Sequence, residues 1–182
     1  MRLFFALWPS AALQAALASA ARATLVDLEG ARAVPSEQLH VTLAFLGVVA
    51  PERLEAAQSA AGEALEAHAL ASAGGQPPGV RLGFERLEHW RRAQVLCATA
   101  TAPPAARSLA AALRHALLRA GFTPDLKPFR AHVTLARHVR RAPAEQPFHA
   151  VIWPLECLAL VESETRPEGS LYSIRSSWTL SA

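Results

Sequence analysis

The sequence predicts an α+β protein whose two halves are built alike. Apolar segments with strand character are interleaved with helices, and the last part of the chain resembles hairpins, which favours α+β over a doubly wound fold. The pentapeptide at residues 40–44, His-Val-Thr-Leu-Ala, recurs unchanged at residues 132–136, 92 residues later in a chain of 182. A repeat at half of the chain length indicates duplication of one supersecondary unit, with the two copies related by a pseudo-twofold axis.

The first half of the chain predicts two strands and two helices. Residues 2–8 are aromatic and aliphatic and predict a buried strand, after which Pro9-Ser10 starts a helix with apolar residues at helical spacing. Residues 39–46 form a second expected strand, and Pro51 opens a second helix. The stretch 72–79, rich in Gly and Pro, predicts a loop at the boundary between the halves.

The second half repeats this pattern and adds strands at its end. Residues 80–88 and 94–100 predict a hairpin, and Pro103-Pro104 precede a helix that closes at Gly121. Residues 131–138 return to strand character, and a loop rich in Arg and Pro is expected at 140–147. Two apolar segments, 150–161 and 171–180, are expected to finish the chain as strands.

Composition limits the classes of function. The hydrophobic fraction of 52% and the charged fraction of 18% are typical of a packed domain, and the net charge of +3 mildly favours anionic ligands. Lys127 is the sole lysine and lacks the K-x-D-G context of an ATP-dependent ligase, and no phosphate-binding P-loop motif is present. Cys97 and Cys157 stand apart in apolar runs, and neither a CxxC pair nor an HExxH helix occurs. We therefore expect no metal and no cofactor.

The same features predict where the protein works. Pro9-Ser10 interrupts the apolar N-terminal run too early for a usual signal peptide, and no apolar stretch is long enough to span a bilayer. Unpaired cysteines fit a reducing compartment. We expect a cytoplasmic monomer that makes no membrane contact.

The repeated motif places one histidine and one threonine on the same face of each strand. Side chains alternate along a strand, so His40 and Thr42 point one way while Val41 and Leu43 point the other. The second copy arranges His132 and Thr134 in the same manner. If the two faces meet across a symmetric cleft, two imidazoles and two hydroxyls surround a volume that suits a phosphate.

That constellation predicts acid–base chemistry at phosphorus. Histidine titrates near neutrality, so one imidazole can take a proton from water while the other protonates a leaving ribose oxygen. The threonine hydroxyls would donate to the non-bridging oxygens, where negative charge develops. Opening a strained five-membered cyclic phosphate in this way requires no metal. The catalytic candidates are therefore His40 and His132, with Thr42 and Thr134 as phosphate-binding residues.

The alternative is that the motif serves packing alone. One His-Val-Thr-Leu segment is an ordinary strand. Two identical copies change the balance, because packing would preserve the valine and the leucine but gives no reason to keep a polar histidine and threonine in both.

The paired His-x-Thr-x motifs resemble those of the two-histidine phosphoesterase superfamily. The segments 40–47 and 129–137, with the opening residues 2–9 and the late Leu171-Tyr172, resemble its bacterial and archaeal RNA 2′,3′-cyclic phosphodiesterase branch, also called 2′-5′ RNA ligases. The resemblance covers nearly the whole chain. It implies a single bilobal domain over residues 1–182, with two pseudo-symmetric lobes, each a mainly antiparallel sheet with helices packed outside, and an active cleft between them.

The resemblance also implies roles for individual residues. It implies a 2′-phosphate product, His40 as the acid, His132 as the base and Arg137 as a phosphate contact. Arg137 lies five residues after His132, so a regular strand would send it to the opposite face. It reaches the cleft only if the strand ends or bulges there, or if its side chain wraps the edge.

Further candidates would contact RNA. Aromatic residues can stack on a base, although core packing is their commoner fate; the candidates are Phe45, Trp90, Phe129 and Trp153. The basic cluster Arg137, Arg140 and Arg141 either lines an RNA path or forms a solvated loop.

Three functions compete on this evidence. The first is hydrolysis of 2′,3′-cyclic phosphate on RNA ends or on nucleotides. The second is reversible 2′-5′ ligation of RNA halves by the same histidines. The third is a non-catalytic RNA- or nucleotide-binding module, against which the presence of both histidines and both threonines argues.

Overall fold

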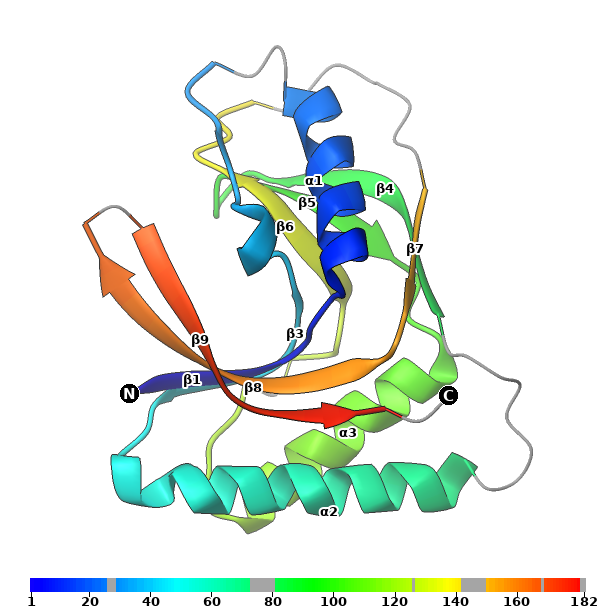
Figure 1. The fold of residues 1–182 in the computed structure, drawn as a ribbon, viewed down its shortest axis with the longest axis vertical. Helices are drawn as coiled ribbons and strands as arrows, with labels where there is room; N and C mark the ends of the chain where they lie inside the picture. Colours follow the sequence, from blue (N-terminus) through cyan, green and yellow to red (C-terminus); the bar gives the residue numbers. More distant parts are fainter. Residues whose placement is uncertain (26–28, 73–80, 126, 142–149, 168, 181–182) are drawn as a thin grey trace.

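The chain folds into two antiparallel sheets with helices on their outer faces, as the sequence predicted (Figure 1). The computed structural model describes residues 1–25, 29–72, 81–125, 127–141, 150–167 and 169–180. Sheet A has the strand order β3-β1-β8-β9, and sheet B has the order β2-β6-β5-β4-β7. The strands are β1 Arg2–Leu7, β2 Arg32–Ala33, β3 Val41–Val48, β4 Arg81–Trp90, β5 Val95–Ala100, β6 Ala131–Arg137, β7 Val151–Pro154, β8 Cys157–Arg166 and β9 Gly169–Thr179. The helices are α1 Ala11–Leu25, α2 Leu54–Ser72 and α3 Pro104–Arg119, with short 3-10 turns at Ser36–Gln38 and Pro51–Arg53.

Local sequence signals account for where these elements begin and end. The apolar run of β1 is buried along its length, which suits a strand hydrogen-bonded on both sides by β3 and β8. Helix α1 starts where the Ser10 hydroxyl accepts a hydrogen bond from the Leu13 amide, 3.4 Å away. Helix α3 starts with Pro104 at its first position and stops before Gly121, whose φ of +74° is left-handed.

Helices α1 and α3 pack on the sheet of the opposite half. Helix α1 follows β1 of sheet A but contacts β6 and β7 of sheet B, whereas α3 follows β5 of sheet B and packs with α2 beneath sheet A (Figure 1). One buried cluster therefore contains Leu7 and Leu17 from the first half together with Phe84 and Trp153 from the second. This exchange ties both halves into one core.

The internal repeat is visible in the order of the elements. A shift of 92 residues carries β1 onto β5, α1 onto α3 and β3 onto β6, and both motif strands hydrogen-bond to the strand that starts their own repeat. The expectation for the C-terminal region was wrong in detail. It holds three strands rather than two, because Leu155-Glu156 separates β7, which joins sheet B, from β8, which joins sheet A.

Some expectations concern residues that the structure does not describe. Most of the predicted loops at 72–79 and 140–147 lies outside the described residues. Among the helices of the described ranges, none is both long and apolar enough to cross a membrane. That residues 1–182 act as one bilobal domain, as a monomer and in the cytoplasm stays a prediction from the sequence.

Candidate active site

The two motif strands lie next to each other where sheets A and B meet. Strands β3 and β6 are neighbours in space, although they belong to different sheets. Val41 of the first copy and Val133 and Leu135 of the second are fully buried in the same cluster. Because alternate side chains of a strand point to opposite faces, the histidines and threonines of both copies turn away from that core. All four are only partly buried.

Hydrogen bonds hold the His40 ring in a defined tautomer. Its Nδ1 lies 2.6 Å from the Gln38 carbonyl oxygen, which can only accept, so Nδ1 carries a proton. In the neutral ring Nε2 then has a lone pair, and the Thr42 hydroxyl donates to it at 3.1 Å. The atom free to exchange protons with a substrate is therefore Nε2, with a motif hydroxyl beside it.

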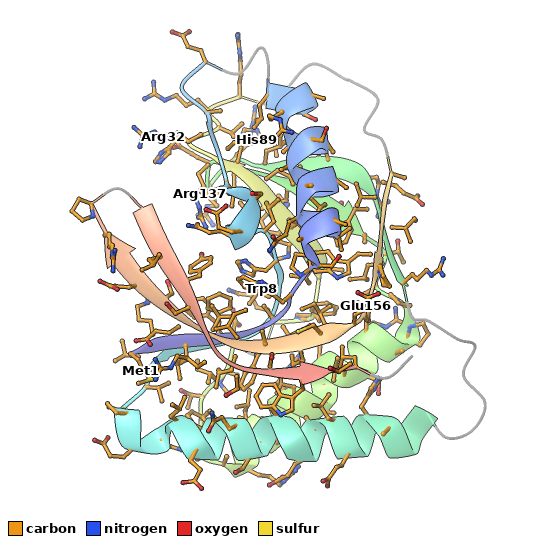
Figure 2. The ribbon with its side chains drawn as sticks, in the orientation of Figure 1. Met1, Trp8, Arg32, His89, Arg137 and Glu156 are labelled. Atoms are coloured by element: carbon orange, nitrogen blue, oxygen red, sulfur yellow. The ribbon has the colours of Figure 1, made fainter. Side chains whose placement is uncertain are left out.

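Aromatic rings surround His40 on the sheet A side. The ring centroid of Phe4 lies 4.9 Å away, that of Tyr172 5.4 Å away in an edge-on arrangement, and that of Trp8 5.8 Å away at an interplanar angle of 10°. In Figure 2 Trp8 lies in the middle of the molecule, between the two sheets. Burial against these rings disfavours the imidazolium and lowers the pKa of His40 to about 4, although the Gln38 carbonyl opposes the shift.

His132 has the same tautomer but a more polar environment. Its Nδ1 donates to the Arg130 carbonyl at 2.8 Å, the counterpart of the bond made by His40. The Trp90 ring lies 4.6 Å away, and Glu88 accepts hydrogen bonds from Trp90 Nε1 at 2.9 Å and from the Arg130 guanidinium at 2.8 Å. Burial lowers the pKa of His132, and the charge of Arg130 lowers it further, whereas the Arg130 carbonyl and the charge of Glu88 raise it.

The two imidazoles interact electrostatically with each other. Positive charge on His132 and on Arg137 lowers the pKa of His40. The three side chains are therefore close enough for their charges to interact. The structure thus brings together side chains that are 92 residues apart in the sequence.

A β-bulge brings Arg137 to the same face as His132. In the ladder with β5, Thr134 pairs with Cys97 and Ala136 with Leu96, so Leu135 has no partner of its own. The extra residue breaks the alternation, and Leu135 and Ala136 are both buried while Arg137 is exposed. A bulge is one of the three ways in which, according to the sequence analysis, Arg137 could reach the cleft.

The first copy bulges at the equivalent point and presents an aromatic ring instead. Thr42 pairs with Ala6 and Ala44 with Phe5, which leaves Leu43 as the extra residue of β3. Phe45, which the shift of 92 residues places on Arg137, is 40% exposed and stacks on Phe4 at 5.8 Å and 5°. The two-fold arrangement is therefore chemically unequal, with an arginine on one side and an aromatic ring on the other.

The remaining candidates differ in position. Trp90 lies against His132, Phe129 is packed in part against the core, and Trp153 is 1% exposed, which excludes base stacking by Trp153. The Thr134 hydroxyl lies 3.8 Å from Cys97 Sγ, and burial raises the pKa of that thiol to about 11. The thiol stays protonated and can donate to Thr134, which leaves the hydroxyl hydrogen of Thr134 available to another acceptor.

A cavity of about 590 Å³ includes Gln38 and Arg137 in its lining, although neither His40 nor His132 lines it. Ser170 and Leu171 also line it, and Gln38 is the residue whose carbonyl holds the His40 ring. Within the described part of the chain, no three His, Cys, Asp or Glu side chains are grouped so that they could hold a metal ion.

Comparisons with known proteins identify the family. A model of the 2′-5′ RNA ligase superfamily matches residues 9–166. The chain belongs to this superfamily. An RNA 2′,3′-cyclic phosphodiesterase of Thermus thermophilus is 34% identical, with 99% of this chain and 90% of the relative covered. The Escherichia coli protein of the same name is 33% identical over 66% of this chain and 63% of the relative. The resemblance inferred from the sequence is confirmed.

Solved structures agree with the superfamily assignment. Escherichia coli LigT complexed with NADP+ has a TM-score of 0.77 at 27% identity and covers 100% of this chain and 98% of its own. LigT complexed with 3′-AMP has a TM-score of 0.78 at 27% identity, with 98% and 97% of the two chains covered. The expected α+β fold class is therefore confirmed.

Sequence reasoning missed several residues of this superfamily member's candidate site. Phe4, Trp8 and Tyr172 surround His40. Phe4 lies on β1, Trp8 directly follows β1 and Tyr172 lies on β9, so no regular spacing in the sequence links the three residues. Tyr172 is the single tyrosine of the chain, which was a usable signal. Glu88 had no distinguishing context in the sequence.

Proposed function

We propose that this chain hydrolyses 2′,3′-cyclic phosphates at RNA ends to 2′-phosphomonoesters, using His40 and His132 as the acid–base pair. The enzyme class is carried over from the two curated relatives, both RNA 2′,3′-cyclic phosphodiesterases. The observation that carries the mechanism is the matched tautomer. Each histidine donates its Nδ1 proton to the carbonyl two residues upstream, so Nε2 is the nitrogen of each ring that can exchange a proton with substrate.

The reaction is an in-line displacement at phosphorus. A water oxygen forms the new bond to phosphorus while the bond from phosphorus to the ribose O3′ breaks. The base takes a proton from the water, and the acid gives its proton to O3′. General acid or base catalysis by one such group accelerates a reaction by roughly 10²- to 10⁴-fold. Thr42, Thr134 and Arg137 donate to the non-bridging oxygens as charge builds up on them.

The acid needs a proton that burial disfavours in the free protein. Both histidines have lowered pKa values, so both are ready to act as bases near neutrality. A bound phosphate anion raises the pKa of a neighbouring imidazole and supplies the acid form. We assign the acid to His40 and the base to His132, as the family resemblance implies.

Variants tested on two substrates decide this assignment. In a nitrophenyl phosphodiester, the nitrophenolate leaving group departs from phosphorus without protonation by a general acid. The variant that lacks only the acid therefore retains turnover of that ester. We expect His40→Ala to keep activity on the nitrophenyl ester and His132→Ala to lose it. The reverse pattern exchanges the two roles.

The test of the function is product analysis with RNA that ends in a 2′,3′-cyclic phosphate, carried out in EDTA. Wild-type protein should yield a 2′-phosphate end, and His40→Ala and His132→Ala should each reduce turnover by roughly 10²-fold or more. His115→Ala, on the exposed surface of α3, is the matched control and should turn over normally. Full turnover by both site variants contradicts the histidine mechanism, and loss of activity in EDTA contradicts metal independence.

Ligation is the second candidate because the same groups catalyse the reverse step. The superfamily carries the name 2′-5′ RNA ligase. Incubation with one RNA ending in a cyclic phosphate and a second bearing a 5′-hydroxyl separates the two functions. A joined product demonstrates ligation, and a 2′-phosphate end alone demonstrates hydrolysis.

A further inference from the structure

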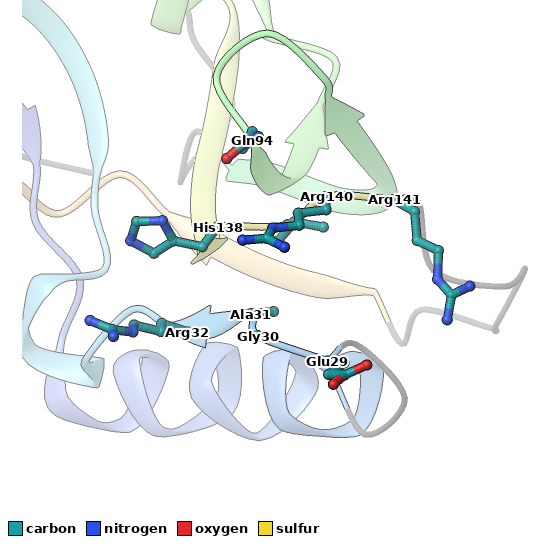
Figure 3. Close-up of a pocket in the computed structure, with 9 residues that line it drawn as sticks. Glu29, Gly30, Ala31, Arg32, Gln94, His138, Arg140 and Arg141 are labelled. Atoms are coloured by element: carbon teal, nitrogen blue, oxygen red, sulfur yellow. The ribbon is translucent and has the colours of Figure 1, made fainter.

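Two cavities share part of their walls, and one of them is lined by Gln38 and Arg137 of the candidate site. The cavity of about 590 Å³ extends from Gln38 and Arg137 to Arg32 and His138. A second cavity, of about 630 Å³, is lined by Arg32 and His138 again and continues to Arg140 and Arg141 (Figure 3). Because the same two residues line both, the cavities adjoin and form one concave surface that starts beside the site.

Most of the arginines that line these cavities form no ion pair with a carboxylate of the described residues. Arg32 of β2 pairs directly with Arg137 of β6 in an antiparallel ladder, where opposite residues share a face, and like charges in that position repel. In the described ranges, neither of them forms an ion pair, and the same holds for Arg140 and Arg141. Arg166 also lines the first cavity, but Glu164 neutralises it at 3.0 Å.

The segment that carries Arg140 and Arg141 is anchored. After β6 the backbone turns at His138, whose φ of +58° is left-handed. Val139 follows with 1% exposure, its amide donates to the Gln94 carbonyl at 2.9 Å, and its carbonyl accepts a hydrogen bond from His89 Nε2 at 2.8 Å. The two arginines are exposed on a backbone that packing and hydrogen bonds position.

We propose that the two adjoining cavities bind the phosphodiester backbone of the nucleotides on the 5′ side of the cyclic phosphate, with Arg32, Arg140 and Arg141 as the phosphate contacts. The inference rests on the proposed function, because Arg137 and the histidines mark the end where the terminal phosphate lies. Unneutralised guanidinium groups spaced along a concave surface suit a series of phosphates in single-stranded RNA. A cyclic mononucleotide occupies the site of the histidines and Arg137 without reaching these three arginines, so the surface favours an RNA end over a free nucleotide.

The test combines turnover with binding. The variant R32Q/R140Q/R141Q should turn over 2′,3′-cyclic AMP within twofold of wild type, while its KM for a decaribonucleotide with a cyclic phosphate end rises tenfold or more. Binding is measured by fluorescence anisotropy with a labelled decaribonucleotide that ends in the 2′-phosphate. Loss of three phosphate contacts should reduce the slope of log Kd against log salt by about 2. Between about 50 and 200 mM salt, wild-type binding should therefore weaken roughly fifteenfold more than binding by the variant.

The variant R81Q/R114Q/R119Q is the control, since it removes the same charge from β4 and α3, away from both cavities. Equal RNA binding and salt slope in wild type and R32Q/R140Q/R141Q would overturn the proposal, as would an equal loss in the control. Loss of cyclic AMP turnover to the same extent as RNA turnover would also overturn it. If wild type turns over neither substrate, the proposed function fails, and the anisotropy measurement still decides the backbone surface independently.

Discussion

Acidification should destabilise this protein through His40. Burial lowers the pKa of His40 to about 4 in the folded chain, whereas the ordinary value of 6.5 applies when the chain is unfolded. The unfolded state therefore binds a proton more readily, and stability is complete above pH 6.5 and falls as the pH drops towards 4. At 1.36 kcal/mol per pKa unit, the full loss is about 3 kcal/mol below pH 4, of which about 2 kcal/mol has been lost by pH 5.

The measurement is urea unfolding of wild type and His40→Gln at about pH 7.5 and about pH 5. His132 and His68 also have pKa values lowered by burial, so wild type loses more than the share of His40 alone. Both proteins contain His132 and His68, so these contributions cancel when the loss of unfolding free energy in His40→Gln is subtracted from that in wild type. We expect wild type to lose about 2 kcal/mol more than His40→Gln between the two pH values.

His115→Gln is the matched control, because this histidine is exposed on α3. It should follow wild type at both pH values. A difference between wild type and His40→Gln below about 0.5 kcal/mol would refute the reasoning, because it would mean that the aromatic surroundings do not exclude the imidazolium.

Three other substitutions probe the surroundings of the histidines. Glu88→Gln removes the negative charge that raises the pKa of His132, so the limb of the pH–rate profile that belongs to His132 should move to lower pH; an unchanged profile would contradict this electrostatic role. Gln38→Ala deletes the hydrogen bond that its side chain donates to the Ser170 carbonyl at 2.7 Å, and urea unfolding should show a loss of about 1 kcal/mol. Phe45→Ala removes an exposed ring, and if that ring stacks on the base, KM for 2′,3′-cyclic AMP should rise roughly tenfold with little change in Tm. An unchanged KM would assign the ring to packing on Phe4.

Most of the secondary structure follows from local signals in the sequence. The apolar run of β1, the proline at the start of α3 and the glycine after it act within a few residues, so their effects can be read without tertiary information. The C-terminal strands were the exception. Leu155-Glu156, directly after Pro154, divides β7 from β8, and the division reflects the chain crossing from one sheet to the other, which a single proline does not predict.

Arg137 shows where sequence reasoning met its limit. Strand periodicity placed it on the wrong face, and the bulge at Leu135 reverses that. The bulge depends on the register between β5 and β6, which is decided by packing on both faces of the sheet.

By itself the sequence predicted the two histidines, their threonines and the chemistry that they suit, because an exact repeat of polar residues in an apolar strand is a local and conspicuous pattern. The tertiary structure alone decided the environment of each histidine. Burial beside Phe4, Trp8 and Tyr172 lowers the pKa of His40, while the charges of Glu88 and Arg130 act on the pKa of His132 with opposite signs. Desolvation and charge act through space, so two identical motifs become different acids only when distant strands have folded around them.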